Sequence, residues 1–213
     1  MTEPTHPLID LNSNAINVTD QLLVCLAGNT ARGDLEAVKR DWLCLAEKDH
    51  QAGLEIILQT HLFAGYPRTI NALAVVRKLG CTLNESTDAP VEQWRGDGEN
   101  LCSQIYAGTY DKLRVAIGSL HVDLEKWMLE TGYGRVLSRP GLTARQREFG
   151  VVAVLGGQNV KPQLMSHLRG AIHVGASMES LEQVIGLVGK IWGEQAELES
   201  LKVFKKLVGA GLS

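Results

Sequence analysis

Apolar residues recur at helical spacing along most of this 213-residue chain, and this period constrains the fold more than any other feature. In the runs 54–62 and 181–188 they fall at i, i+3, i+4 and i+7 or i+8, which places them on one face of a helix. No segment shows sustained alternation of apolar and polar residues, the pattern of a half-buried strand, and aromatic residues make up only 5% of the chain. The period therefore predicts an all-helical fold.

Residues typical of helix ends divide the periodic runs. Asp49 and Ser177 precede such runs and are good N-cap residues, because a short side-chain oxygen accepts from a free backbone amide. Thr143 with Gln146 fits a capping box. Pro162 suits the first turn of the helix that follows the Gly156-Gly157 turn. We expect helices over residues 17–28, 35–47, 50–64, 68–79, 98–107, 110–131, 144–156, 162–174 and 178–207.

The two ends of the chain align with each other without a gap when one is shifted by 128 positions, so that residues 19–79 overlay residues 147–207. Gly65 then falls on Gly193, and the cap Asp49 falls on the cap Ser177. We interpret this match as an internal duplication. It predicts an N-terminal arm (1–16), a first helical repeat (17–80), a connecting loop and helices (81–140, with a loop over 80–97) and a second repeat (141–213).

Charge and composition exclude several classes of protein. The net charge is -3 and no Lys/Arg block stands out, which argues against a nucleic-acid or anionic-membrane surface. The apolar stretches are too short to span a membrane, and the first residues lack the apolar core of a signal peptide, so we expect a cytoplasmic protein. The four scattered cysteines predict buried thiols, with no disulfide framework and no metal site: Cys25, Cys44, Cys81 and Cys102.

One pair of side chains in the second repeat is suited to acid–base chemistry. Glu148 and His167 lie at comparable distances from the Gly156-Gly157 turn, so an α-helical hairpin brings them together. A carboxylate fixes the tautomer of an imidazole and raises its basicity, which makes the pair a proton relay. The alternative is a structural ion pair.

Three segments resemble the carboxymuconolactone decarboxylase / alkylhydroperoxidase D-like family. The first joins Arg147-Glu148-Phe149 to the run HLRGAIHVGAS at 167–177, the second is LFAGYPR at 62–68 with NAL at 71–73, and the third is YGRVLSRPGL at 133–142. The resemblance extends from about residue 19 onward. It implies an all-helical fold and a homo-oligomer, commonly a dimer, trimer or hexamer.

The redox branch of that family has a conserved pattern of Glu, Cys, Cys and His. When Glu148 and His167 take the Glu and His positions, the two cysteine positions fall on Val160 and Gln163. Peroxide reduction needs a reactive thiolate and a resolving thiol, which valine and glutamine cannot supply. Alkylhydroperoxidase activity is therefore not expected. In the first repeat the Glu and His positions hold Asp20 and Lys39, from which we expect a structural ion pair.

The resemblance then implies the decarboxylase branch: a cofactor-free lyase acting on a small carboxylated lactone or a related acid. His167 would deliver the proton and Glu148 would orient it, while Arg147, Arg169 and Arg139 would hold substrate carboxylates as bidentate partners. The alternative is a non-catalytic oligomer of the same family, serving as a binding or structural scaffold. We expect no cofactor, no metal, no nucleic acid and no membrane partner.

Overall fold

The computed structural model describes residues 6–82 and 86–210, and within these residues every regular element is a helix. The all-helical prediction is confirmed. Elements η1 and η2 are single 3₁₀ turns and η3 is a π-helix. In chain order the elements are α1 (Val18–Arg32), α2 (Leu35–Cys44), η1 (Glu47–Asp49), α3 (His50–Gln59), α4 (His61–Ala64), α5 (Tyr66–Lys78), α6 (Val91–Tyr106), η2 (Ala107–Thr109), α7 (Tyr110–Leu120), α8 (Val122–Trp127), η3 (Met128–Leu137), α9 (Ala144–Gly157), α10 (Lys161–His173), α11 (Met178–Trp192) and α12 (Glu194–Gly209).

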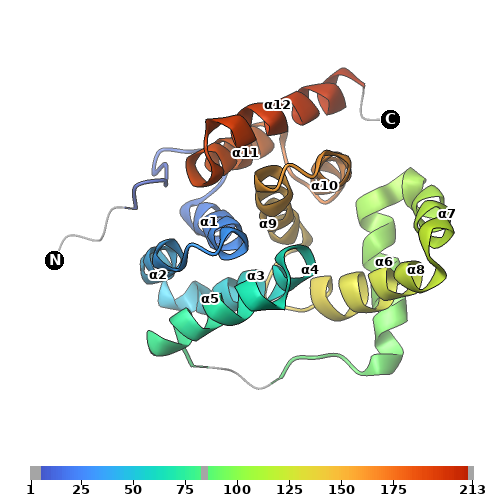
Figure 1. The fold of residues 1–213 in the computed structure, drawn as a ribbon, viewed down its shortest axis with the longest axis horizontal. Helices are drawn as coiled ribbons and strands as arrows, with labels where there is room; N and C mark the ends of the chain where they lie inside the picture. Colours follow the sequence, from blue (N-terminus) through green and yellow to red (C-terminus); the bar gives the residue numbers. More distant parts are fainter. Residues whose placement is uncertain (1–5, 83–85, 211–213) are drawn as a thin grey trace.

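Helix α9 lies at the centre of the main body, where α1, α10 and α11 pack against it (Figure 1). Every residue from Arg147 to Gly156 is buried, so this helix has no solvent-facing side. Its apolar side chains join those of α10 and α11 in the largest core cluster, around Phe149, Leu168 and Ile185. Burial on all sides explains why charged residues on α9 must find partners inside the protein.

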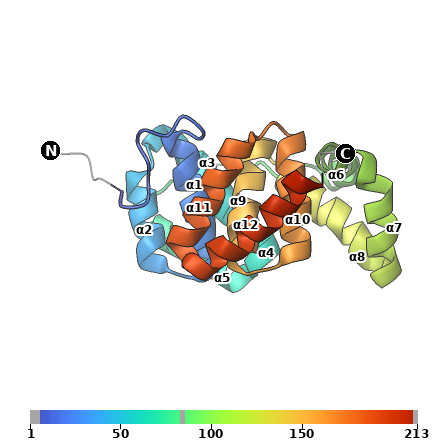
Figure 2. The same ribbon diagram turned by 90° about the horizontal axis from the view of Figure 1, so that it is seen from above.

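Helices α6, α7, α8 and η3 form a separate group beside this body, which we call the side group (Figures 1 and 2). Its main contact is between α6 and η3, and α10 is the helix of the body that packs against α6. A small apolar cluster around Cys102, Leu129 and Tyr133 holds the group together.

The two ends of the chain follow the same order of elements, with α1, α2, α3 and α5 corresponding to α9, α10, α11 and α12. Gly65 and Gly193, which the 128-residue shift aligns, adopt nearly the same conformation (φ 81°, ψ 161° and φ 99°, ψ 163°). Each precedes the last helix of its half. This left-handed region favours glycine, because a Cβ atom would be strained there.

Four expected helices differ from the structure, one of them being 50–64, which breaks at Thr60 into α3 and α4. Helix α6 begins at Val91, inside the expected 80–97 loop, because Pro90 leads into a helix whose polar and glycine-rich first half hides the helical period. The expected 110–131 helix breaks at His121, whose extended backbone ends α7 and whose Nδ1 accepts from the Asp123 amide to begin α8. The expected 178–207 helix breaks at Gly193.

The described part of the N-terminal arm lies against the body. Ile16 is buried, and Lys190 donates from Nζ to the Leu8 carbonyl at 2.9 Å. His6 meets the fully buried Asp41 of α2, with 2.7 Å between Nε2 and Oδ1. The arm is therefore part of the folded protein as far as His6.

Candidate functional site

The hairpin of α9 and α10 brings Glu148 and His167 into contact. The turn between them contains Asn159 at φ 58°, and the two helices pack along their length. Oε2 of Glu148 lies 2.8 Å from Nδ1 of His167, and the two side chains are 1% and 7% exposed. The predicted contact is therefore present in the structure, while its role stays a prediction.

This contact decides which nitrogen of His167 is available. An ionised carboxylate only accepts hydrogen bonds, so Nδ1 donates its hydrogen to Glu148. The other nitrogen, Nε2, makes no hydrogen bond to any residue in the described part of the chain. A neutral His167 therefore presents an unused acceptor at Nε2, which is the form a general base requires.

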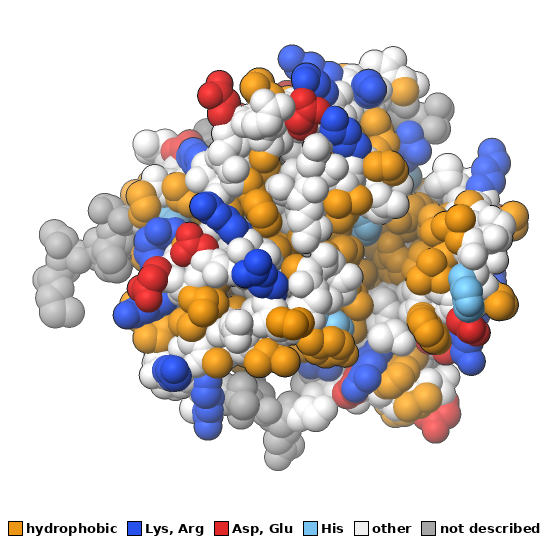
Figure 3. All heavy atoms as spheres, in the orientation of Figure 1, with side chains coloured by type: hydrophobic (Ala, Val, Ile, Leu, Met, Phe, Trp, Pro, Cys, Tyr) orange, Lys and Arg blue, Asp and Glu red, His pale blue; other side chains and the backbone are white. Residues whose placement is uncertain are grey.

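Aromatic rings surround the imidazole. Phe63 of α4 meets it edge-on with 5.9 Å between ring centroids, and Tyr106 at the end of α6 does so at 6.5 Å. Both rings are half-buried, so the site lies close to the surface. Figure 3 shows the surface hollowed where the side group meets the body, with hydrophobic side chains gathered there.

Two tyrosines of the side group are hydrogen-bonded to each other beside His167. The Tyr133 hydroxyl donates to the Tyr106 hydroxyl over 3.3 Å. Burial raises the pKa of Tyr106 to about 12 and holds the pKa of Tyr133 well above its ordinary value. Both therefore remain phenols at neutral pH. Sequence reasoning missed them, because they lie in the connecting segment, outside both repeats.

Because Gly170 has no side chain, α10 can approach α6 closely at this point. A Cβ atom there would lie 2.5 Å from Cγ2 of Ile105 and 3.3 Å from Oε2 of Glu148. The Ile105 carbonyl also accepts from Nδ1 of His173 at 2.7 Å. The tyrosine pair and the Glu148–His167 pair are thus held together by close backbone packing.

Two of the three arginines expected to bind substrate are already paired. Arg147 is buried and donates to Gln59 at 2.9 Å and to Glu55 at 3.4 Å. Arg139 meets the same Glu55 carboxylate with two nitrogens, each about 3.0 Å from an oxygen. Arg169 is half-buried, and its Nε is buried with no hydrogen-bond partner in the described structure.

The ion pair expected in the first repeat is wrong. Asp20 is buried and accepts from Gln146 at 2.8 Å and from Arg145 at 3.3 Å, both at the start of α9. Lys39 lies exposed on α2 and forms no ion pair with the described residues. The carboxylate turns toward α9 because donors from the opposite repeat are nearer than the lysine, whose long side chain stays in water.

The cysteines lie mostly in the interior. Cys25, Cys81 and Cys102 are buried, and Cys44 is partly so. Burial raises the pKa of Cys102 to about 12 and raises that of Cys25 further. Such thiols stay protonated and are poor nucleophiles. Within the described residues no three metal-ligating side chains come together.

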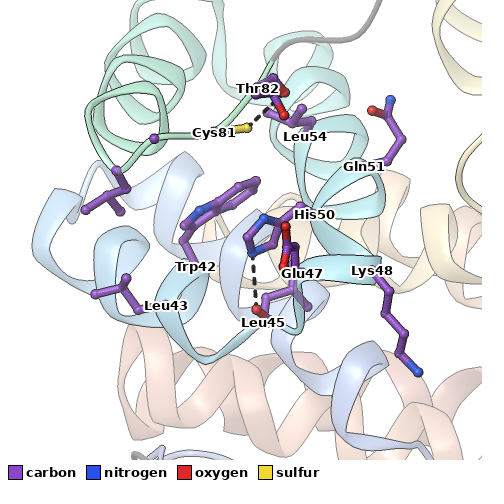
Figure 4. Close-up of a pocket in the computed structure, with 12 residues that line it drawn as sticks. Trp42, Leu43, Leu45, Glu47, Lys48, His50, Gln51, Leu54, Cys81 and Thr82 are labelled. Carbon is purple, nitrogen blue, oxygen red and sulfur yellow. Dashed lines mark hydrogen bonds between the residues drawn. The ribbon is translucent and has the colours of Figure 1, made fainter.

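The roomiest cavity described lies away from His167, between α2, α3 and the end of α5 (Figure 4). It holds about 620 Å³. The Trp42 ring stacks on His50 with 4.4 Å between centroids, and Nε2 of His50 donates to the Leu45 carbonyl at 3.2 Å. None of the residues expected in the functional site lines this cavity.

A second cavity, of about 200 Å³, includes Arg139 in its wall. Arg135 and Asp88 line it too, and they meet at 2.7 Å. His61 lines it as well, stacked on Tyr66 with 4.9 Å between ring centroids. Both arginines among the described residues of its wall are paired with carboxylates.

The chain is similar to two yeast proteins. It is 27% identical to "Peroxisomal protein 2" of Saccharomyces cerevisiae over 163 residues, covering 62% of this chain and 58% of that protein. It is 26% identical to "Peroxisomal protein 2" of Schizosaccharomyces pombe over 133 residues, covering 60% of this chain and 62% of that protein. The alignments span less than two thirds of either relative. No protein-family model matches the chain.

These names correct two expectations. The cytoplasmic location is wrong, since both relatives are named for the peroxisome; charge and hydropathy do not distinguish one aqueous compartment from another. The carboxymuconolactone decarboxylase-like lyase is contradicted by the same names. A short pattern of common residues fixes where a Glu and a His lie, but not which reaction they serve. The segment resemblance itself stays a prediction. In the described residues no helix has the length and hydropathy of a membrane span.

Proposed function

We propose that this chain is a peroxisomal protein with an acid–base site at Glu148 and His167. In this site Nε2 of His167 takes a proton from a carbon of a small molecule and returns it. The observation that carries the proposal is the buried 2.8 Å contact that leaves Nε2 without a hydrogen-bond partner among the described residues. The location rests on the two yeast relatives named for the peroxisome.

The surroundings of His167 favour a substrate with an apolar, uncharged body. Phe63 and Tyr106 offer ring edges rather than charges. Arg139 and Arg147, which would otherwise select a carboxylate, are occupied by Glu55. Charge on the substrate would lose its hydration here without gaining a partner from either arginine.

Deuterium exchange tests the acid–base proposal directly. The protein would be incubated in deuterated water with uncharged carbon acids, namely simple and cyclic ketones and nitroalkanes, and exchange followed by NMR. We expect exchange above the buffer rate for at least one probe, and a loss of about 100-fold or more in His167→Asn. Glu148→Gln should slow exchange less severely, because an amide oxygen still accepts from Nδ1.

The matched control is His121→Asn. His121 is exposed at the break between α7 and α8, and asparagine also caps helices well, so this variant should exchange the probes like the unaltered protein. Exchange that is absent with every probe, or unchanged in His167→Asn, would overturn the acid–base proposal.

The location has its own test. The full chain, fused to a fluorescent protein at one terminus or the other, would be expressed in yeast with a peroxisomal marker. We expect punctate signal that overlaps the marker. Diffuse signal from both fusions would contradict the peroxisomal assignment and leave the chemistry of the site unaffected.

A further inference from the structure

We propose that Tyr106, supported by Tyr133, is a catalytic hydrogen-bond donor that holds an oxyanion next to His167, so that the substrate is a carbonyl compound reacting through its enolate. This inference rests on the proposed function and adds a substrate class to it.

The hydrogen bond between the two tyrosines leaves the hydrogen of Tyr106 unused. The buried Tyr133 hydroxyl has no other acceptor in the described structure, so its hydrogen goes to Tyr106 and the Tyr106 hydrogen remains free for a third group. No other hydrogen bond to the Tyr106 hydroxyl occurs within the described residues. A hydroxyl that accepts one hydrogen bond becomes a stronger donor of the next.

The hydroxyl of Tyr133 is buried in apolar surroundings. Its side chain lies in the apolar cluster of the side group, only 5% of the residue is exposed, and Tyr106 is its hydroxyl's one partner in the described structure. A phenylalanine would fill that space without a polar group to satisfy. The hydroxyl is therefore explained by its effect on Tyr106, which makes Tyr133 a positioning residue.

The protonation state agrees with a donor. Burial raises the pKa of Tyr106 to about 12, so its phenol retains the hydrogen at neutral pH. The neighbouring His167 presents Nε2 as the acceptor. The two rings meet edge-on at 6.5 Å between centroids, a spacing that lets one small molecule contact both. Their roles are thus complementary rather than redundant.

The backbone beneath the tyrosines is held closely. Gly98 of α6 and Gly134 of η3 face the opposite helix, and a Cβ atom on either would lie 1.9 Å from a carbonyl oxygen of Leu129 or Trp94. Tyr133 belongs to a π-helix, a rare conformation that is frequent at functional sites. Such packing fixes the distance between Tyr133 and Tyr106.

The proposed step balances without a further reactant. Nε2 of His167 removes a hydrogen from the carbon next to the carbonyl as a proton. The electron pair of that C–H bond forms the new C–C double bond, and the carbonyl π pair moves to oxygen, which Tyr106 stabilises by hydrogen bonding. Return of the proton to the same carbon gives exchange, and return to a conjugated carbon gives isomerisation.

Binding of 4-nitrophenol tests the oxyanion donor, because its phenolate resembles an enolate and its absorbance reports ionisation. We expect the unaltered protein to bind the phenolate and to lower the apparent pKa of the bound probe. Tyr106→Phe should weaken binding by about tenfold or more. Tyr133→Phe should bind more weakly by a smaller factor and raise the pKa of the bound probe, a change that a purely structural role would not cause.

Tyr110→Phe is the matched control. Tyr110 packs against the same apolar cluster, but its buried hydroxyl has no partner in the described structure, so binding should not change. Thermal unfolding of each variant shows whether it is folded, and the imidazole NMR signals of His167 show whether its contact with Glu148 persists.

The two proposals fail separately. If the unaltered protein does not bind 4-nitrophenol, or if folded Tyr106→Phe binds it and exchanges carbon acids normally, the oxyanion donor is wrong while the His167 site stands. If His167→Asn leaves exchange unchanged, the acid–base site is wrong whatever Tyr106 does. Loss of exchange in both variants, with 4-nitrophenol binding lost only in Tyr106→Phe, supports both.

Discussion

Glu55 pairs with two arginines that lie far from it in the sequence. It lies on α3, and it pairs with Arg139, before α9, and with Arg147, on α9 itself. Glu55 and Arg147 are each 3% exposed, and Arg139 is 14% exposed, so solvent screens these charges little. Removing the shared carboxylate would leave a buried arginine without its counter-charge.

We therefore expect Glu55→Gln to lower the free energy of unfolding by about 3–5 kcal/mol, measured by urea denaturation. Glu99→Gln is the control: Glu99 pairs with Arg95 at the surface and its side chain is 42% exposed, so its loss should cost no more than about 0.5 kcal/mol. If both variants lost the same free energy of unfolding, the buried ion pairs of Glu55 would stabilise the protein no more than a surface pair does.

The tyrosines predict how stability changes in alkaline solution. The folded-state pKa of Tyr106, about 12, lies above the ordinary value of 10, because burial disfavours the phenolate. The phenol therefore contributes its full stability below pH 10, and this contribution is lost as the pH rises from 10 to 12. The melting temperature should fall over that interval, and Tyr106→Phe should fall less steeply. If the melting temperatures of the unaltered protein and of Tyr106→Phe fell in parallel with pH, the raised pKa of Tyr106 would be contradicted.

At the residue scale, sequence reasoning located Glu148 and His167 because their spacing across one hairpin fixes their contact. It did not locate the partners of the arginines. Glu55 lies 84 positions from Arg139 and 92 from Arg147, and no local pattern links residues so far apart. Tyr106 and Tyr133 escaped for the same reason, since their contact depends on how α6 packs against η3.

At the scale of elements, α6 and η3 depend on glycine at their crossing. Gly134→Ala would place a Cβ atom 1.9 Å from the Trp94 carbonyl oxygen. Because that oxygen belongs to the backbone, the clash can be relieved only if one of the two helices moves. We expect this variant to lose about 1–3 kcal/mol of stability and to weaken 4-nitrophenol binding, because the tyrosines move apart.

Gly96→Ala, on α6 where it crosses η3, provides the comparison. No atom lies within 4 Å of the position where its Cβ would stand. Alanine favours a helix over glycine by about 1 kcal/mol, so denaturation should show unchanged or slightly higher stability. If Gly134→Ala behaved like Gly96→Ala, the close approach of α6 and η3 would not matter for folding.

Helix boundaries were predictable where a cap or a glycine stood at the end of a periodic run, as at Thr143 and Ser177. They were not predictable where the period continued through a break. The run 178–207 keeps its apolar rhythm across Gly193, and only the left-handed backbone there divides it. The π-helix likewise has no sequence signature of its own.

At the scale of the whole molecule, the helices of the side group leave apolar side chains uncovered. Val115, Leu120 and Val122 are each 74% exposed, and Trp127 is 61% exposed. Exposed apolar groups concentrated on one part of a protein are typical of an interaction surface. The expected homo-oligomer, whether dimer, trimer or hexamer, stays a prediction, and these helices are the place to test it.

Light scattering should give a mass that is a multiple of 23.2 kDa at micromolar concentration. Val115→Glu combined with Trp127→Glu should lower it, because charge would be buried at the contact. Leu198→Glu, at an exposed position on α12, should not change the mass. A mass of 23.2 kDa for the unaltered protein would contradict the prediction.

The site around His167 draws on three stretches of the chain: Phe63 from the first repeat, Tyr106 from the connecting segment, and the Glu148–His167 pair from the second repeat. The pair shares a hairpin and survives any fluctuation that leaves α9 and α10 together. Tyr106 stays in place only while α6 remains packed on α10. Under the proposed reaction, brief separation of the two would leave the base without its oxyanion donor, so turnover would follow the fraction of time that the two parts spend in contact.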